Sequence, residues 1–124
     1  MLTITDAQMA ALERERRETF IKRVDDWLLQ EDRAWPQAAP DQRVQILDAI
    51  LTYAEQSGME SEQQYAVFCR AAIFLRADWQ AFIEAPAQRE MLMDDKVQSD
   101  SKLRAFYTRA EMTAQQRAMQ ARRD

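Results

Sequence analysis

The stretch YAEQSGMESEQQYAVFCR, Tyr53 to Arg70, contains Gly58, the one glycine among the 124 residues of the chain. A glycine just past a helix end adopts a left-handed backbone conformation at low cost and lets the last helical carbonyls find hydrogen-bond partners. Ser61 and Gln64 follow with the spacing of a capping box, which begins a new helix. The stretch therefore predicts a tight turn at Gly58 between two helices that form an antiparallel hairpin.

The remaining sequence is typical of an all-α protein. Ala, Glu, Gln, Arg, Leu and Met, all good helix formers, dominate it, and it contains three prolines. No segment alternates apolar and polar residues with β-branched enrichment, as strands do. We predict a single compact bundle of about five helices around the central hairpin, in one domain spanning residues 1–124. Residues 1–110 are expected to form its core, and residues 111–124 a tail that is either helical or frayed.

Capping residues and prolines mark the expected helix boundaries. Thr5 and Gln8 have capping-box spacing at the start of the chain, and the two prolines in the segment 33–40 break the first helix. In chain order, the expected helices run from after Thr5 to about Gln30, from near Asp41 to Gly58, from Ser61 onward, from Asp78 to before Pro86, from Pro86 to Met93, and from Ser99–Ser101 onward.

Charge and apolar content limit the classes of partner. The chain has 17 basic and 21 acidic residues and a net charge of −4, which argues against broad nucleic-acid binding because neutralising phosphates requires basic surface. No stretch approaches 18 apolar residues, and the N-terminus lacks the pattern of a signal peptide, so we expect no membrane partner. With one cysteine, no intramolecular disulfide can form, and we expect a cytoplasmic protein.

The residues needed for common catalytic chemistry are missing from the sequence. Without any histidine, the chain cannot build a nucleophile activated by histidine or a metal site that contains histidine. One glycine is too few for a phosphate-binding loop. Cys69 falls on an apolar helix stripe, which indicates a core residue. We therefore expect no enzyme activity, no cofactor and no metal.

Two charged segments allow a further interpretation each. The segment 84–100 has five acidic and two basic residues, which suits either a divalent-cation site or a solvated connection. We predict the solvated connection, because calcium-loop spacing is absent. The arginines at positions 117, 122 and 123 could touch phosphate, but we expect them to complement the dipole of a C-terminal helix.

Five residues are candidates for contact with a protein partner. Trp35 lies in the proline-flanked loop, where it either caps the core or anchors a partner. Met112 and Met119 are seven residues apart and fall on one face of a continuing helix, and we expect Phe106 and Tyr107 to lead into that face. An exposed methionine face adapts readily to a partner. The occupant could be another protein or a second copy of this chain.

With its helices placed, the chain resembles small helical proteins encoded beside effectors of the bacterial type VI secretion system. The resemblance lies in the order of four segments, which cover roughly residues 2–107: LTITDAQMAALERERRETFIKRV (2–24), ILTYAEQSGMES (50–61), QQYAVFCRAAIFL (63–75) and ADWQAFI (77–83). The family often has a histidine in its first helix and a glycine after its third, and both are absent here. The tail from Glu111 onward has no counterpart in the family pattern.

The resemblance implies a cytoplasmic accessory protein without catalytic activity. Such a protein would act as a co-chaperone that binds an effector chaperone or adaptor before the effector is loaded onto the VgrG spike. The alternative is an immunity protein that neutralises a cognate secreted toxin by direct binding, for which the acidic segment 84–100 would be suited.

Overall fold

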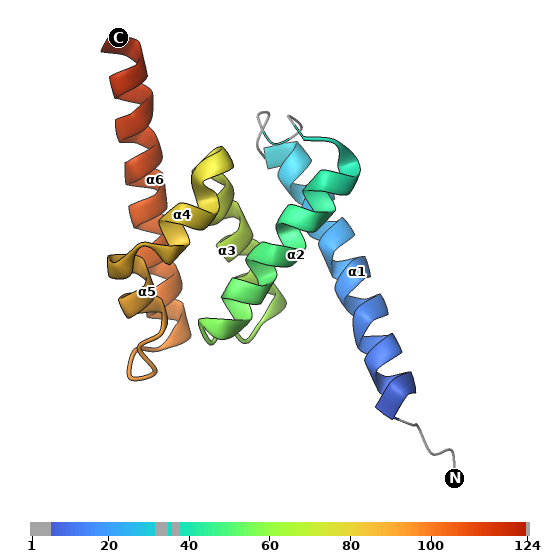
Figure 1. The fold of residues 1–124 in the computed structure, drawn as a ribbon. Coiled ribbons are helices and arrows are strands. Elements are labelled where there is room, and N and C mark those ends of the chain that lie inside the picture. The colour runs from blue at the N-terminus through green and yellow to red at the C-terminus, as the bar shows by residue number, and fades with distance from the viewer. Residues whose placement is uncertain (1–5, 32–34, 36–37, 124) are drawn as a thin grey trace. The chain divides into compact units, whose positions relative to one another are not determined.

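The computed structural model describes residues 6–31, 35 and 38–123, and every regular element within them is helical, which confirms the all-α prediction. Contacts group the chain into two compact units, unit 1 (residues 1–47) and unit 2 (residues 48–124). The helices, drawn in Figure 1, are α1 (Asp6–Glu31), α2 (Pro40–Gln56), α3 (Glu62–Ile73), the 3₁₀ helix η2 (Arg76–Asp78), α4 (Trp79–Glu84), α5 (Pro86–Leu92) and α6 (Ser99–Arg123).

In unit 1, α1 buries one apolar stripe. Ile21, Val24 and Leu28, spaced by three and four residues, are each at most 3% exposed, as expected for one face of an amphipathic helix. The helix ends at Glu31, one residue beyond the predicted end. The predicted capping box of Thr5 lies outside the described residues.

A buried carboxylate joins three segments of unit 1. The Trp35 Nε1–H group donates a hydrogen bond of 2.7 Å to Asp25 Oδ1. Arg43 Nε donates to the same oxygen at 2.9 Å, and Arg43 Nη1 donates to the Ala38 carbonyl at 3.1 Å. Because hydrogen bonds to charged groups are stronger than neutral ones, this cluster fixes the connection between α1 and the start of α2.

The turn after α2 has the predicted geometry. Gly58 has a φ of +83°, in the left-handed region. The Gly58 N–H donates to the Glu55 carbonyl at 3.1 Å, and the Met59 N–H donates to the Ala54 carbonyl at 3.1 Å, which is the hydrogen-bond pair of a Schellman motif. Met59 is buried. The turn therefore ends α2 with its last carbonyls paired and its apolar residue covered.

The next helix begins with the predicted capping box. Gln64 N donates to Ser61 Oγ at 3.1 Å, and Gln64 Oε1 accepts from Ser61 N at 3.3 Å. The same glutamine also reaches the start of α6, where its Nε2 donates to Ser99 Oγ at 2.9 Å and to Asp100 Oδ1 at 2.6 Å. One side chain thus joins the N-terminal ends of two helices that are 35 residues apart in sequence.

A buried lysine supports the Gly58 turn from α6. Lys102 is 5% exposed, and its Nζ donates to the Ser57 carbonyl at 3.3 Å. A cation at this position complements the negative end of the α2 dipole. A Cβ atom added to Gly58 would lie 4.0 Å from Lys102 Nζ, which is ordinary contact. Steric space therefore does not require glycine here, whereas the positive φ does.

Replacing Gly58 with valine is expected to lower the free energy of unfolding by about 1–2 kcal/mol, because a β-branched residue is strained at positive φ. Urea denaturation followed by circular dichroism would measure the loss. Gly58→Asn is the matched control, since asparagine tolerates the left-handed region, and its loss should be smaller. Equal stability of wild type and Gly58→Val would show that the turn is assigned wrongly.

The core of unit 2 is built on aromatic contacts between α3 and α6, the helix pair with the most extensive packing. Phe68 stacks on Phe106 with ring centroids 4.5 Å apart, and Phe82 of α4 contacts Phe106 at 5.8 Å. Phe68 and Phe106 are fully buried. Cys69 is also fully buried, as predicted.

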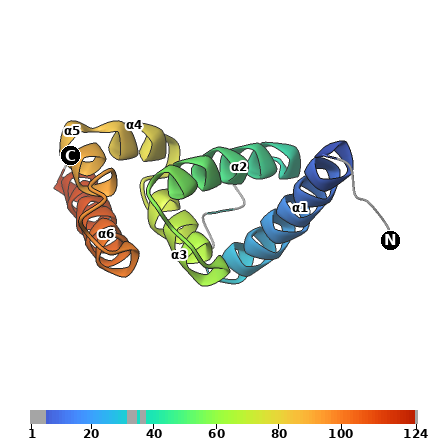
Figure 2. The same ribbon diagram turned by 90° about the horizontal axis from the view of Figure 1, so that it is seen from below.

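The two short helices α4 and α5 connect α3 to α6 (Figures 1 and 2). Pro86 opens α5 at its first position, where the missing N–H is not needed. Asp78 precedes α4 as predicted but makes no side-chain cap. The last helix is continuous to Arg123, so the predicted tail is helical, and its C-terminal part extends beyond α4 and α5 (Figure 1).

Candidate functional site

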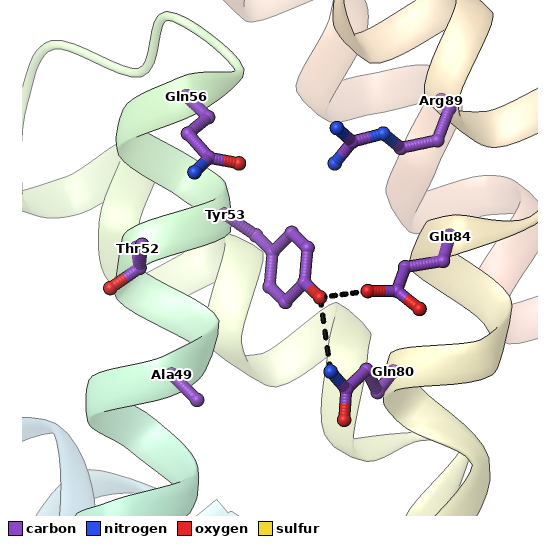
Figure 3. A pocket seen from close by; sticks show the side chains of 7 residues that line it. All are labelled: Ala49, Thr52, Tyr53, Gln56, Gln80, Glu84 and Arg89. Atoms are coloured by element: carbon purple, nitrogen blue, oxygen red, sulfur yellow. Dashed lines mark hydrogen bonds between the residues drawn. The ribbon is translucent and has the colours of Figure 1, made fainter.

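An open groove of about 690 Å³ lies in unit 2 between the last turns of α2 and the pair α4–α5 (Figure 3). Its lining is mixed, with one aromatic ring, one aliphatic side chain and several polar groups. The lining residues are Ala49, Thr52, Tyr53, Gln56, Gln80, Glu84 and Arg89.

The centre of the groove is the side chain of Tyr53. Its hydroxyl donates a hydrogen bond to Glu84 Oε1 and accepts one of 3.1 Å from Gln80 Nε2 (Figure 3). Gln80 and Glu84 are four residues apart on α4 and so face the tyrosine together. The Tyr53 ring meets Trp79 edge to face, with centroids 5.9 Å apart and planes at 78°. These contacts fix the ring between α2 and α4.

The surroundings of Tyr53 favour its neutral form. The hydrogen bond to Glu84 raises the pKa of the Tyr53 hydroxyl above its ordinary value of 10.0, and burial raises it further. The hydrogen bond from Gln80 and the positive charge of Arg89 lower the pKa in part. Tyr53 therefore stays protonated at neutral pH and acts as a hydrogen-bond donor to the carboxylate.

The side chains of Arg89 and Gln56 supply two hydrogen-bond donors at the edge of the groove. The Arg89 guanidinium extends from α5 over the groove toward Gln56, the last residue of α2 (Figure 3). Within the part of the chain that the structure describes, neither side chain makes a hydrogen bond or an ion pair. The arrangement can therefore bind an anionic group by hydrogen bonding and ion pairing.

The structure separates the five predicted contact residues into two classes. Trp35 is 6% exposed and bonded to Asp25, so it covers the core of unit 1 and is not an exposed anchor. Phe106 is fully buried against Phe68, so the prediction that it leads into an exposed face is wrong. Both belong to the core because their rings have close partners within their own units.

The other three candidates are accessible to different degrees. Tyr107 is half-buried and meets Phe74 edge to face, with ring centroids 5.3 Å apart. Met112 and Met119 are 55% and 56% exposed. A helix turns by about 100° per residue, which places both methionines on one face, opposite the buried Ala110. The predicted methionine face thus exists on α6, without the aromatic residues.

The acidic segment 84–100 does not converge on one point. Glu84 accepts from Tyr53, Asp94 Oδ1 accepts from the Lys96 N–H at 3.0 Å, and Asp100 accepts from Gln64. Among the described residues, no group of three or more Asp, Glu or Cys side chains is placed to hold a metal ion. At the C-terminal end of α6, Arg117 pairs with Asp78 at 3.0 Å on the exposed surface, a contact that the helix-dipole interpretation did not include.

Sequence reasoning missed the groove. Tyr53 is next in sequence to the buried Ala54 of α2, and Gln80 and Glu84 have the spacing of neighbours on one helix face. The spacing of Gln80 and Glu84 could have indicated a shared polar face, but it does not reveal which other helix packs against that face.

The comparisons with known proteins leave the family of this chain open. No family model matches it, and neither a curated protein nor a solved structure has a significant match. None of the helices in the described residues is both long and apolar enough to cross a bilayer.

Proposed function

We propose that this protein is a non-catalytic binding module, a co-chaperone-like accessory protein of a type VI secretion effector chaperone or adaptor. The observation that carries the proposal is the exposed pair Met112 and Met119 in the C-terminal half of α6. Methionine side chains are flexible and polarisable, and they suit contact surfaces that adapt to a partner. The link to type VI secretion rests on the resemblance in sequence, and the cytoplasmic location follows from it.

One feature of the backbone bears on a departure from the family pattern. The family that the sequence resembles often has a glycine after its third helix, whereas this chain has none there. Arg76, in the turn that follows α3, has a φ of +54°. This is the left-handed conformation that a glycine adopts most easily.

The methionine face of α6 belongs to a continuous helix. The ion pair between Arg117 and Asp78 joins this part of the helix to η2. Thr113 and Ala114, on the inner side, are half-buried, while both methionines face solvent. A partner would thus meet a preformed helix face, which lowers the entropy cost of binding.

The test measures binding of the full chain to a purified type VI secretion effector chaperone or adaptor, by isothermal titration calorimetry. Replacing Met112 and Met119 together with glutamine should weaken the complex about tenfold or more, because burying two methionines contributes more than the 1.4 kcal/mol that a tenfold change requires. Glutamine has nearly the helix propensity of methionine, so the helix should persist.

Met93→Gln is the matched control, since Met93 is 41% exposed but follows α5. It should leave the affinity unchanged. Equal affinity of wild type and the double variant would exclude α6 as the contact. If the chain instead dimerises through this face, light scattering should show that the molar mass falls from that of a dimer to that of a monomer when both methionines are replaced.

The immunity alternative is tested with the same chain. An immunity protein would abolish the activity of a toxin encoded directly beside it at one copy per toxin and would not bind the chaperone. The structure gives this alternative less support than the sequence did, because three of the five acids in segment 84–100 are engaged within the fold.

A further inference from the structure

The groove on unit 2 has unused binding capacity at one end. Arg89 is half-buried, and its guanidinium extends over the groove toward the Gln56 amide (Figure 3). Among the described residues, no carboxylate pairs with this guanidinium. A partly desolvated cation without a partner is unfavourable. An anion placed between Arg89 and Gln56 would therefore gain both an ion pair and amide hydrogen bonds.

The chemistry of the groove selects a carboxylate. The planar guanidinium donates two parallel hydrogen bonds that match a carboxylate, and the Gln56 amide supplies a further N–H donor. The Glu84 carboxylate lines the same groove and accepts from Tyr53. Its negative charge disfavours a doubly charged phosphate more than a singly charged carboxylate. The Tyr53 ring and Ala49 offer apolar surface to the carbon atoms of the ligand.

The shape of the groove favours a protein segment over a free small molecule. The groove has a volume of about 690 Å³ and is open to solvent. Sites for small ligands usually bury most of the ligand surface, which an open groove does not do. A protein segment that carries the carboxylate would cover the opening with its own neighbouring residues.

We propose that this groove binds an acidic side chain presented by a protein partner, with Arg89 and Gln56 as the donors. The proposal deepens the proposed function and rests on it in one respect, namely that the acidic side chain belongs to a partner protein. Tyr53, Gln80 and Glu84 are positioning residues, because their hydrogen bonds hold the wall of the groove.

The experiment is an NMR titration of the full ¹⁵N-labelled chain with a blocked pentapeptide that has one glutamate between alanines. The Arg89 Nε–H and Gln56 side-chain resonances should shift and saturate at millimolar peptide. Arg89→Gln should weaken peptide binding at least tenfold. Arg89→Lys should weaken binding less, because lysine keeps the positive charge but cannot donate the two parallel hydrogen bonds of the guanidinium. Arg104→Gln, an exposed arginine outside the groove, is the matched control and should bind as wild type does.

Three further probes identify the source of the carboxylate. The same peptide with glutamine in place of glutamate should shift neither resonance, and acetate should bind at least tenfold more weakly than the glutamate peptide. Inorganic phosphate should not compete at equal concentration. Acetate binding as tight as the peptide would overturn the protein-segment proposal, and phosphate binding as tight would overturn the carboxylate proposal.

The outcomes for this site and for the proposed function are distinguishable. If the glutamate peptide shifts the Arg89 Nε–H resonance but the chain does not bind the effector chaperone, the proposed function is overturned and the proposed site stands. If the chain binds the chaperone but the Arg89 Nε–H resonance does not shift with the glutamate peptide, the proposed site alone is overturned.

Discussion

Replacing Phe106 with alanine is expected to lower the free energy of unfolding of unit 2 by about 3–5 kcal/mol, the usual cost of removing a buried phenylalanine. Phe106 is fully buried, stacks on Phe68 at 4.5 Å and contacts Phe82 at 5.8 Å. The substitution leaves a cavity where three helices meet. Since domains are stable by about 5–15 kcal/mol, urea denaturation followed by circular dichroism should show a large fall in the midpoint.

Two variants on the same helix make the result specific. Met112→Ala removes an exposed side chain of α6, and its effect should stay within about 0.5 kcal/mol. Phe106→Leu keeps much of the volume and should cost less than the alanine variant, so it measures the packing even where alanine prevents folding. A loss for Phe106→Ala as small as that for Met112→Ala would contradict the assignment of Phe106 to the core.

The helices of this protein could be predicted because their ends carry local chemistry. Gly58 marks the end of α2, Ser61 and Gln64 cap α3, and Pro86 opens α5, all within a few residues of the boundary that each one sets. Capping depends on hydrogen bonds between near neighbours in sequence. Such contacts can be read from spacing alone.

The turn after α3 shows where this reading fails. Arg76 has a φ of +54°, although neither glycine nor asparagine marks the position. A non-glycine residue in this region is strained and is kept there by the surrounding structure. Local sequence therefore contains no indication of this conformation.

The candidate site was missed for a related reason. Tyr53 and Glu84 are 31 residues apart and meet because α4 returns to the end of α2. Phe106 was placed on the wrong side of its helix because its partner Phe68 lies 38 positions earlier in the sequence. Spacing shows which residues share a helix face, but the identity of the facing helix depends on the whole fold.

The second large effect is expected at Asp25 in unit 1. Its carboxylate accepts from Trp35 at 2.7 Å and from Arg43 at 2.9 Å, and the side chains of Asp25 and Arg43 are only 13% and 12% exposed. Asp25→Ala would leave a mostly buried guanidinium and an indole N–H without their acceptor. We expect the free energy of unfolding to fall by about 3 kcal/mol, in the range for breaking a buried ion pair from one side, as measured by urea denaturation with tryptophan fluorescence.

Variants at Asp26 and at Asp25 itself show whether the loss of stability comes from the charge of Asp25 or from any change in this part of α1. Asp26→Ala alters the adjacent, exposed carboxylate and should change stability by less than about 0.5 kcal/mol. Asp25→Asn keeps an acceptor oxygen for Trp35 but removes the negative charge that pairs with Arg43. Its loss of stability should therefore lie between those of Asp26→Ala and Asp25→Ala. In the double variant Asp25→Ala with Arg43→Ala, the buried charges are both removed, and the loss should be smaller than the sum of the single losses. Additive losses would mean that Asp25 and Arg43 stabilise unit 1 independently.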